Sequence, residues 1–177
     1  MADGELLSDA DAGAFRYREE YSLRAGSDIP HMRYFEISLF HVLPGHEKDW
    51  DSLVKMYIAG YEKIPEVHWA TYETVYGQQN GAYVVFTPMK SATEIDRGFG
   101  QGKQFEAAMG EDGMKKLSEL SAAAIESSQT NLFMFNPRMS YVSDEWVKAD
   151  PEFWAPKPAH APAAASKKPA EKPSTPQ

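Results

Sequence analysis

The chain has 177 residues, of which 42% are hydrophobic, which is enough for one packed domain with short appendages. Its formal net charge is −8, and because residues 155–177 hold four lysines and one acid, residues 1–154 carry −11. A body this acidic repels phosphate backbones, which argues against nucleic-acid binding. The absence of cysteine excludes disulfides, thiolate metal sites and cysteine nucleophiles.

The sequence contains no run of 18 apolar residues, so we expect no membrane span. The first thirteen residues, MADGELLSDADAG, are acidic and lack the apolar segment of a signal peptide. We therefore expect a cytoplasmic protein by default, and an exported one if the natural N-terminus is longer.

The first half of the chain alternates between strand and helix patterns. Period-two alternation predicts a strand over Met32–Val42, and after a Pro-Gly pair helical spacing predicts an amphipathic helix over about His46–Lys63. β-branched and aromatic residues predict strands over Val67–Tyr76 and Ala82–Thr87. The loop between them contains Asn80-Gly81, a strong hairpin signal.

The second half predicts one more helix and one more strand. The capping box Ser91–Glu94 marks a helix start near Ala92. Glycines predict one interruption at positions 98, 100 and 102 and another at positions 110 and 113, before the helix resumes over Met114–Ser127. Asn131–Phe135 reads as the last strand. The order β-α-β-β-α-β predicts an α+β, ferredoxin-like fold, with a four-stranded antiparallel sheet that carries both helices on one face.

We expect four segments along the chain. They are an N-terminal extension (1–31), the ferredoxin-like domain (32–142), an aromatic arm (143–155) and a Pro/Ala/Lys tail (156–177). The arm holds Trp146, Phe153 and Trp154, so it is expected to dock on its own domain or on a partner. The tail lacks large apolar residues and is predicted to be disordered.

The extension is similar to the end of the domain. Phe15–Tyr17 and Phe133–Phe135 are both aromatic-x-aromatic segments that follow a polar turn and precede a similar polar exit. One interpretation is that residues 1–29 are the last turn and strand of an earlier repeat copy whose first part is absent. The other interpretation is chance similarity between two short strands.

The order of elements over Met32–Val142, with the strand RYFEISLFHV leading into PGHEKDW, resembles the dimeric α/β-barrel superfamily. This group includes antibiotic-biosynthesis-type monooxygenases and NIPSNAP-like proteins. The resemblance implies that two such sheets pack their open faces into a barrel around a small-molecule pocket. Members include cofactor-free oxygenases and haem enzymes. No catalytic residue of the family matches a position of this chain, so none is carried over.

An open, aromatic sheet face must be covered, and the strand pattern places Tyr34 and Phe40, with Tyr72 and Tyr76, on the face opposite Phe35, Ile37 and Leu39. We therefore expect a homodimer or a higher homo-oligomer. The competing interpretation of the polar and aromatic face is an ordinary oligomer interface without a ligand.

A two-residue turn at Asn80-Gly81 would pair Tyr76 with Val85 and so decide which side chains share the open face. In this register the face carries a candidate catalytic trio, His68, Tyr72 and Glu36, and the pocket-lining residues Tyr34, Ser38, Thr74, Tyr76 and Tyr83. An imidazole, a carboxylate and several phenols suit proton transfer or the binding of a polar aromatic ligand. A slip of one residue would exchange the two faces. For His68 alone, a structural role is the competing interpretation.

Two further segments contain residues that can bind metals or phosphates, but their spacing does not favour such a site. His41, His46 and Glu47 flank a Pro-Gly break, so their spacing fixes no shared face for a metal ion. The segment Gly98–Lys103 follows a capping box, whereas a phosphate-binding loop follows a strand, so a broken helix is the preferred interpretation. We expect no metal and no cofactor.

The leading functional hypothesis is a small-molecule-binding α/β-barrel protein. This hypothesis extends to a cofactor-independent, monooxygenase-like oxidoreductase that acts on a small aromatic or polar-aromatic compound. The first alternative is a non-catalytic module that oligomerises through its sheet face. The second alternative is a haem-binding barrel, because neutral histidines can ligate iron.

Overall fold

The computed structural model describes residues 12–26, 28–77 and 81–155. It divides into two compact units, Met1–Asn136 and Pro137–Gln177. The division comes earlier than the expected domain end at Val142. The predicted tail (156–177) and the first part of the repeat hypothesis (residues 1–11) lie outside the described residues.

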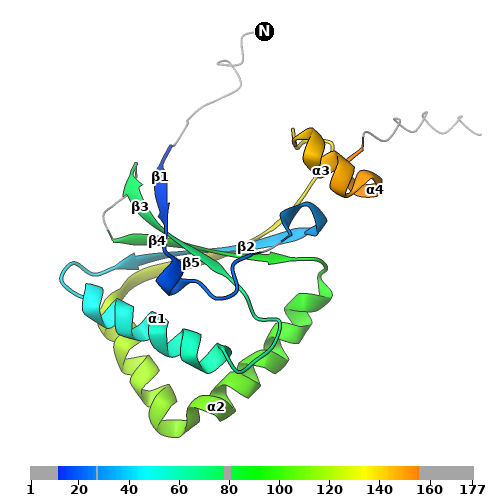
Figure 1. Cartoon of the computed structure of the whole chain (residues 1–177). Helices are drawn as coiled ribbons and strands as arrows, with labels where there is room; N and C mark the ends of the chain where they lie inside the picture. The colour runs from blue at the N-terminus through cyan, green and yellow to red at the C-terminus, as the bar shows by residue number, and fades with distance from the viewer. Residues whose placement is uncertain (1–11, 27, 78–80, 156–177) are drawn as a thin grey trace, which may run out of the picture. The chain divides into compact units, whose positions relative to one another are not determined.

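The first unit is built on a five-stranded sheet in the order β1-β3-β4-β2-β5, with every neighbouring pair antiparallel (Figure 1). Its strands are β1 (Ala14–Tyr17), β2 (Tyr34–Val42), β3 (Ala70–Tyr76), β4 (Ala82–Met89) and β5 (Ile125–Met134). The predicted α+β, ferredoxin-like arrangement is confirmed by the last four strands and the helices between them. The expected number of strands was wrong, because β1 adds a fifth strand beside β3.

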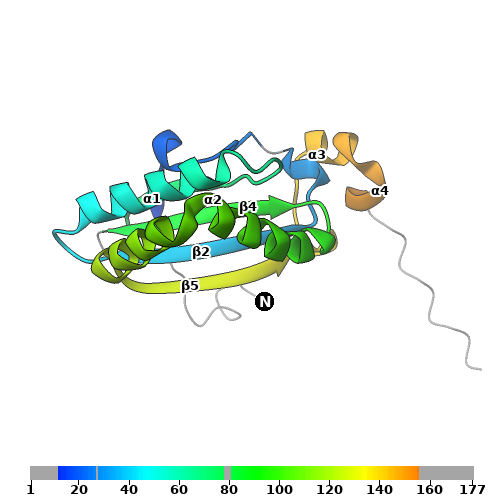
Figure 2. The same cartoon turned by 90° about the horizontal axis from the view of Figure 1, so that it is seen from below.

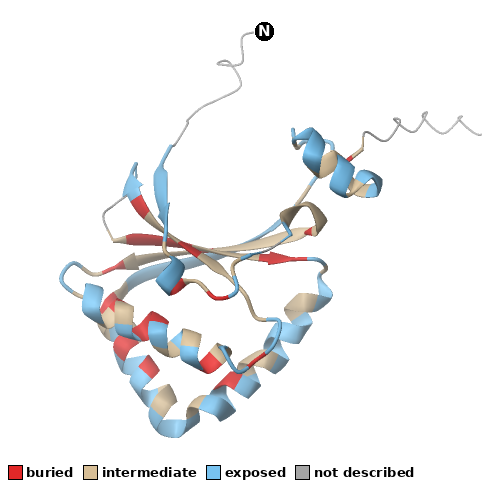
Figure 3. Cartoon of the chain, in the orientation of Figure 1, coloured by how far each residue is buried: buried red, intermediate tan, exposed pale blue. Residues whose placement is uncertain are grey.

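Two long helices, α1 (Glu47–Tyr61) and α2 (Thr93–Ala124), cover one face of the sheet (Figure 2). Buried positions interrupt exposed ones along both helices, as an amphipathic helix requires (Figure 3). The core lies between these helices and the sheet, and its largest buried members include Trp50, Tyr83, Phe105 and Leu117.

The helices cover the sheet face that carries Phe40 and Tyr83. Trp50 of α1 stacks on Tyr83 with ring centroids 4.9 Å apart and contacts Phe40 at 5.4 Å. The expectation that Phe40 and Tyr34 lie on the open face was therefore wrong. Phe35, with every second residue after it in β2, lies on the open face instead, because Trp50 of α1 packs on the side of the strand that carries Phe40.

Helix α2 differs from its prediction in two ways. It continues through Gly98, Gly100 and Gly102, where a break was expected, whereas the break expected at Gly110 is confirmed, since that residue leaves helical geometry (φ 66°, ψ 177°). It ends at Ala124, earlier than predicted, because the residues from Ile125 onward pair along β2. Long-range pairing thus overrides the local helical pattern of residues 125–127.

The N-terminal segment is integrated into the first unit. The 3₁₀ helices η2 (Glu19–Tyr21) and η3 (Ile29–His31) follow β1, and Leu23 exchanges backbone hydrogen bonds with Trp69. The guanidinium of Arg24 donates to the carbonyl oxygens of residues 62, 64 and 67, at 2.5, 3.2 and 2.9 Å. Residues 14–24 therefore belong structurally to the sheet and to the end of α1.

The second unit contains α3 (Asp144–Ala149) and α4 (Pro151–Trp154). Trp146 and Phe153 contact the ring of Trp154 at centroid distances of 5.4 and 4.7 Å. Trp154 is 3% exposed. The aromatic residues of the arm thus contact one another.

Candidate functional site

A hollow of about 290 Å³ lies between α1 and the helix-covered face of the sheet. We call it the inner hollow; its wall is formed by Tyr21, Phe40, Trp50, Leu53, Val54, Tyr57, Tyr61, Trp69, Thr71, Val85, Thr87 and Ile125. None of these side chains is acidic, basic or an imidazole. The volume is near the lower end of the range of about 300–1,000 Å³ that is typical of small-molecule sites.

The spacing of residues in α1 explains why its aromatic side chains line this hollow. Trp50, Leu53, Val54, Tyr57 and Tyr61 recur three and four residues apart, so they share one face of the helix. The opposite wall comes from alternate residues of the sheet. The inner hollow is therefore built from regular elements, which hold side chains more rigidly than loops do.

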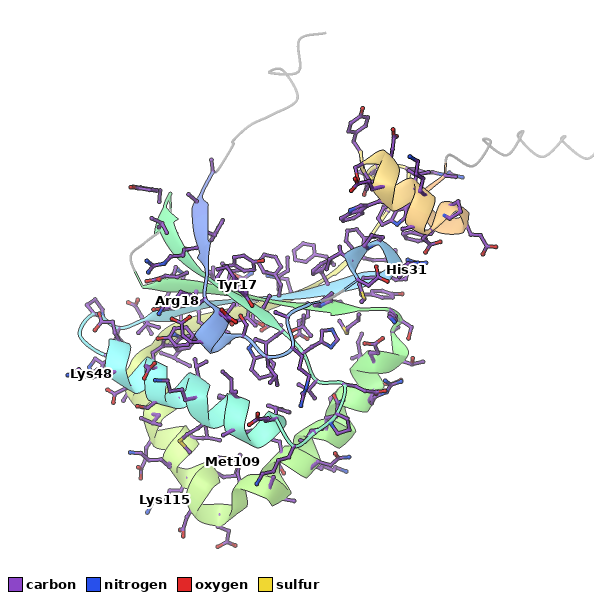
Figure 4. All side chains as sticks on the ribbon, in the orientation of Figure 1. Tyr17, Arg18, His31, Lys48, Met109 and Lys115 are labelled. Atoms are coloured by element: carbon purple, nitrogen blue, oxygen red, sulfur yellow. The ribbon has the colours of Figure 1, made fainter. Side chains whose placement is uncertain are left out.

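Helix α2 supports the tyrosines of α1 from behind. The ring of Phe105 stacks on Tyr61 and Tyr57, with centroid distances of 4.3 and 5.4 Å. This contact is possible because α1 has a glycine at position 60, against which Phe105 and Met109 pack. Figure 4 labels Met109, which lies between α1 and α2.

The titratable groups of the inner hollow are neutral phenols. Burial raises the pKa of Tyr57, and burial together with the nearby Tyr57 and Glu106 raises the pKa of Tyr61. Both hydroxyl groups therefore keep their protons at neutral pH and can donate a hydrogen bond. The indole Nε1 of Trp50, a residue that is 3% exposed, has no hydrogen-bond partner among the described residues.

A backbone carbonyl fixes two further parts of the wall. The Tyr21 oxygen accepts hydrogen bonds from Trp69 Nε1 at 2.8 Å and from Thr71 Oγ1 at 2.7 Å. The Tyr21 hydroxyl in turn donates to Asp51 Oδ1 at 3.3 Å. The N-terminal segment therefore orients the sheet side of the inner hollow.

A second hollow of about 450 Å³ adjoins the inner one, and the two share Tyr61, Trp69 and Thr87 as a common wall. We call it the outer hollow; its other lining residues are Glu36, Glu66, Val67, His68, Met89, Glu94, Ile95, Arg97, Gly98, Phe99 and Gln101. Its lining is charged, in contrast to that of the inner hollow. The pair of hollows therefore has an apolar part and a polar part.

His68 is held by two backbone carbonyls. Its Nδ1 lies 2.8 Å from the oxygen of Glu66, and its Nε2 lies 2.8 Å from the oxygen of Pro88. Carbonyl oxygens only accept hydrogen bonds, so each contact requires an N–H on the ring nitrogen, and a neutral ring can form one of the two bonds at a time. Proton abstraction or haem ligation by His68 would require the loss of one of these contacts.

The structure separates the side chains that the sequence grouped into one site. Glu36 and His68 line the outer hollow, whereas Tyr72 lies on the open face of the sheet. Of the predicted pocket-lining residues, Thr74 and Tyr76 share the open face with Tyr72, while Tyr34, Ser38 and Tyr83 alternate onto the helix-covered face. Ser38 Oγ and Thr130 Oγ1 form a hydrogen bond of 2.8 Å across β2 and β5.

The predicted register between β3 and β4 was wrong. Tyr72 pairs with Val84 and Glu73 pairs with Tyr83, whereas the two-residue turn would have paired Tyr76 with Val85. The last residues of β3 pair with β1 instead of β4. A shift by an odd number of residues moves Tyr83 to the face opposite Tyr72.

Sequence reasoning missed the inner hollow because it treated the aromatic residues of α1 as ordinary core. The signal that could have found it is their size: Trp50, Tyr57 and Tyr61 on one helix face are bulky and carry polar groups that a simple core leaves unsatisfied.

The open face of the sheet carries a shallow hollow of about 520 Å³, lined by Phe15, Ala25, Ile29, Phe35, Ala70, Tyr72, Phe86 and Pro88. Tyr72 contacts Tyr17 and Phe86 at ring-centroid distances of 5.6 and 5.4 Å. The aromatic open face that the sequence predicted thus exists, with a different set of residues on β2.

Among the described residues, no group of three or more His, Cys, Asp or Glu side chains is placed to hold a metal ion. His41 Nδ1 lies 3.0 Å from Ser127 Oγ, and His46 Nδ1 lies 2.9 Å from Asp49 Oδ2. Within the same described part of the chain, no helix has the length and apolar character needed to span a membrane.

Comparison with protein-family models gave no match, and comparison with curated proteins gave none. Among solved structures, the chain is similar to one described as a crystal structure study of an anthrone oxidase-like protein, with 14% sequence identity and a TM-score of 0.43. The match covers 59% of this chain and 45% of that chain, so this chain spans less than half of that protein's length. Inferences about function therefore come from the residues of this chain.

Proposed function

We propose that this chain binds a small aromatic molecule in the inner hollow. The observation that carries the proposal is a space of about 290 Å³ in a wall of aromatic and aliphatic side chains. A planar ring placed there buries its apolar surface and meets other rings, each favourable ring pair contributing about 0.5–1.5 kcal/mol beyond burial. The phenols of Tyr57 and Tyr61 can donate hydrogen bonds to an oxygen atom of the ligand.

Binding is a more direct use of this site than catalysis. The inner hollow has no carboxylate or imidazole that could accept a proton from the ligand. An oxidoreductase activity of the cofactor-independent kind would take its proton acceptor from the outer hollow, where Glu36 lies beside the common wall. This activity is a second candidate, favoured by the position of that carboxylate.

Filling the hollow tests the proposal. Val85 lines the inner hollow on β4, so Val85→Trp should weaken the binding of 2-naphthylmethanol by about tenfold or more, because the added ring occupies the ligand's volume. Titration calorimetry measures the affinity, and thermal denaturation checks that the variant is folded. The matched control is Val75→Trp, at an exposed position on neighbouring β3. Equal affinity in both variants would contradict the proposal.

We further propose that the open face is an interface between copies of this chain. Side chains alternate between the two faces along each strand. On the open face this places uncharged residues from all five strands, including Phe15, Phe35, Tyr72, Phe86 and Phe133. The described residues that alternation places on this face include the imidazole of His41 but no Asp, Glu, Lys or Arg side chain, so two copies can pair there without burying an unpaired carboxylate, ammonium or guanidinium group. Such pairing would produce the α/β barrel to which the sequence has a resemblance.

A further inference from the structure

The protein leaves one carboxylate of the outer hollow without a partner. Glu66 pairs with Arg97, with 2.6 Å between Oε2 and Nη1, and Glu94 Oε1 accepts a hydrogen bond from the backbone N–H of Lys90 at 2.9 Å. Glu36 is half-buried in β2 and has no hydrogen-bond or ion-pair partner among the described residues. A half-buried carboxylate that no described residue pairs with can form a charge-assisted hydrogen bond with a cationic ligand.

Aromatic faces adjoin this carboxylate. The rings of Tyr61 and Trp69 lie 5.9 Å apart at 82° and line both hollows. The indole N–H of Trp69 donates to the carbonyl oxygen of Tyr21, so a ligand can contact the faces of the Trp69 ring but not its N–H group. Aromatic faces attract cations, and the combination of such faces with a carboxylate is typical of ammonium sites.

The backbone beside the outer hollow is strained. Glu66 has a φ of +69°, an uncommon value for a residue with a side chain, and its carbonyl and carboxylate hold His68 and Arg97. Backbone strain of this kind clusters at ligand sites, where the surrounding contacts maintain it. Arg97 and His68 are held by these contacts, and among the described residues neither forms a hydrogen bond or an ion pair with Glu36.

Glu36 lies beside a residue that lines both hollows. It pairs with Thr87 across β2 and β4, and Thr87 is part of the common wall. Phe40, in the wall of the inner hollow, lies four residues further along β2 on the same face, a distance of about 13 Å. An elongated ligand can therefore place a ring in the inner hollow and a polar end at Glu36.

We infer that the site selects aromatic ammonium compounds, whose ring occupies the inner hollow and whose positive charge pairs with Glu36. This inference rests on the proposed function, and it adds the charge and the orientation of the ligand.

Three probes of matched size test it: 2-naphthylmethylammonium, 2-naphthylmethanol and 2-naphthoate. With the full chain at low ionic strength, calorimetry should show the ammonium compound binding about tenfold or more tightly than the alcohol, the order expected of a charge-assisted hydrogen bond. The carboxylate should bind most weakly. Glu36→Gln should abolish the preference for the ammonium compound and leave the affinity for the alcohol unchanged. Glu111→Gln, an exposed carboxylate of α2 outside both hollows, should change neither.

A second measurement separates loss of recognition from loss of folding. Without ligand, Glu36→Gln should melt at the same temperature as the wild type or higher, because the unpaired charge is gone. If the alcohol binds and the ammonium compound has no advantage, or keeps its advantage in Glu36→Gln, the inference is overturned and the proposed function stands. If none of the three probes binds, both are overturned.

Discussion

At Gly60 the two long helices come so close that there is no room for a side chain between them. A Cβ atom placed there would lie 2.3 Å from Cε2 of Phe105 and 3.0 Å from Sδ of Met109. Phe105 is 4% exposed and is stacked against the tyrosines of α1, so its ring cannot move aside easily. One missing methyl group thus sets the separation between α1 and α2 and keeps the wall of the inner hollow in place.

We expect Gly60→Ala to lower the free energy of unfolding by about 1–3 kcal/mol, because overpacking outweighs the gain in helix propensity. Urea denaturation measures the change. Gly98→Ala is the control, since a Cβ atom there meets nothing within 4 Å. A stabilised Gly60→Ala variant would show that α2 is free to shift away from α1.

Tyr83 should make the protein less stable at high pH. Burial, with a smaller contribution from Glu73, raises its pKa to about 12, above the ordinary value of 10.0. The folded state then binds the phenolic proton more tightly than the unfolded state, so this stabilisation is complete below pH 10 and is lost as the pH rises toward 12. The urea midpoint should fall over this range, and fall less in Tyr83→Phe. In Tyr76→Phe, at a position that is 73% exposed, the urea midpoint should depend on pH as it does in the wild type. The same decrease of the midpoint with pH in all three proteins would contradict the assignment to Tyr83.

At the scale of elements, the first half of α2 carries three glycines that its packing does not require. Cβ atoms at Gly98, Gly100 and Gly102 would meet no atom within 4 Å, and all three residues lie within the helix. Glycine in a helix interior lowers stability by roughly 0.5–1 kcal/mol relative to alanine. The segment beside the outer hollow is therefore less stable than a helix with alanine at these positions would be.

Replacing Gly98, Gly100 and Gly102 together by Ala should stabilise this segment and slow its amide hydrogen exchange. The reason is that alanine lowers the conformational entropy of the unfolded chain, while the added Cβ atoms cause no clash in the folded helix. Hydrogen exchange read by mass spectrometry checks the segment directly. Gly110→Ala is the contrasting variant and should destabilise α2, since its φ of +66° is unfavourable for alanine. Unchanged exchange across residues 93–103 in the triple variant would contradict this account.

The strand register is the clearest case in which local signals failed at this scale. The Asn-Gly dipeptide favours a tight hairpin, yet β3 and β4 pair no further than Glu73 with Tyr83. The end of β3 pairs with β1, and Arg16 and Arg18 both bind the carboxylate of Glu73 at 2.5 Å. Burial alone would raise the pKa of Glu73, but these hydrogen bonds and charges outweigh it and hold the pKa below its usual range. Contacts from a distant segment thus determine the register.

At the scale of the whole molecule, the uncharged open face predicts self-association. The chain has a mass of 19.8 kDa, so light scattering at micromolar concentration should give about twice that mass, or a higher multiple. Tyr17→Lys combined with Phe133→Lys places two charges on the open face, at positions that are 45% and 51% exposed, and should produce a monomer. Phe99→Lys, at a residue of α2 that is 73% exposed, should leave the mass unchanged. A monomeric wild type would refute the interface.

The sequence by itself determined the order of the elements in the domain and the presence of an aromatic sheet face, because hydrophobic period and turn residues are local properties. It also indicated Glu36 and His68 as candidate site residues. Only the tertiary structure decided that Tyr72 lies across the sheet from them, that β1 completes the sheet, and that Trp50, Tyr57 and Tyr61 surround a space. The physical reason is that sheet faces alternate with each residue, so register depends on long-range contacts that no local pattern encodes.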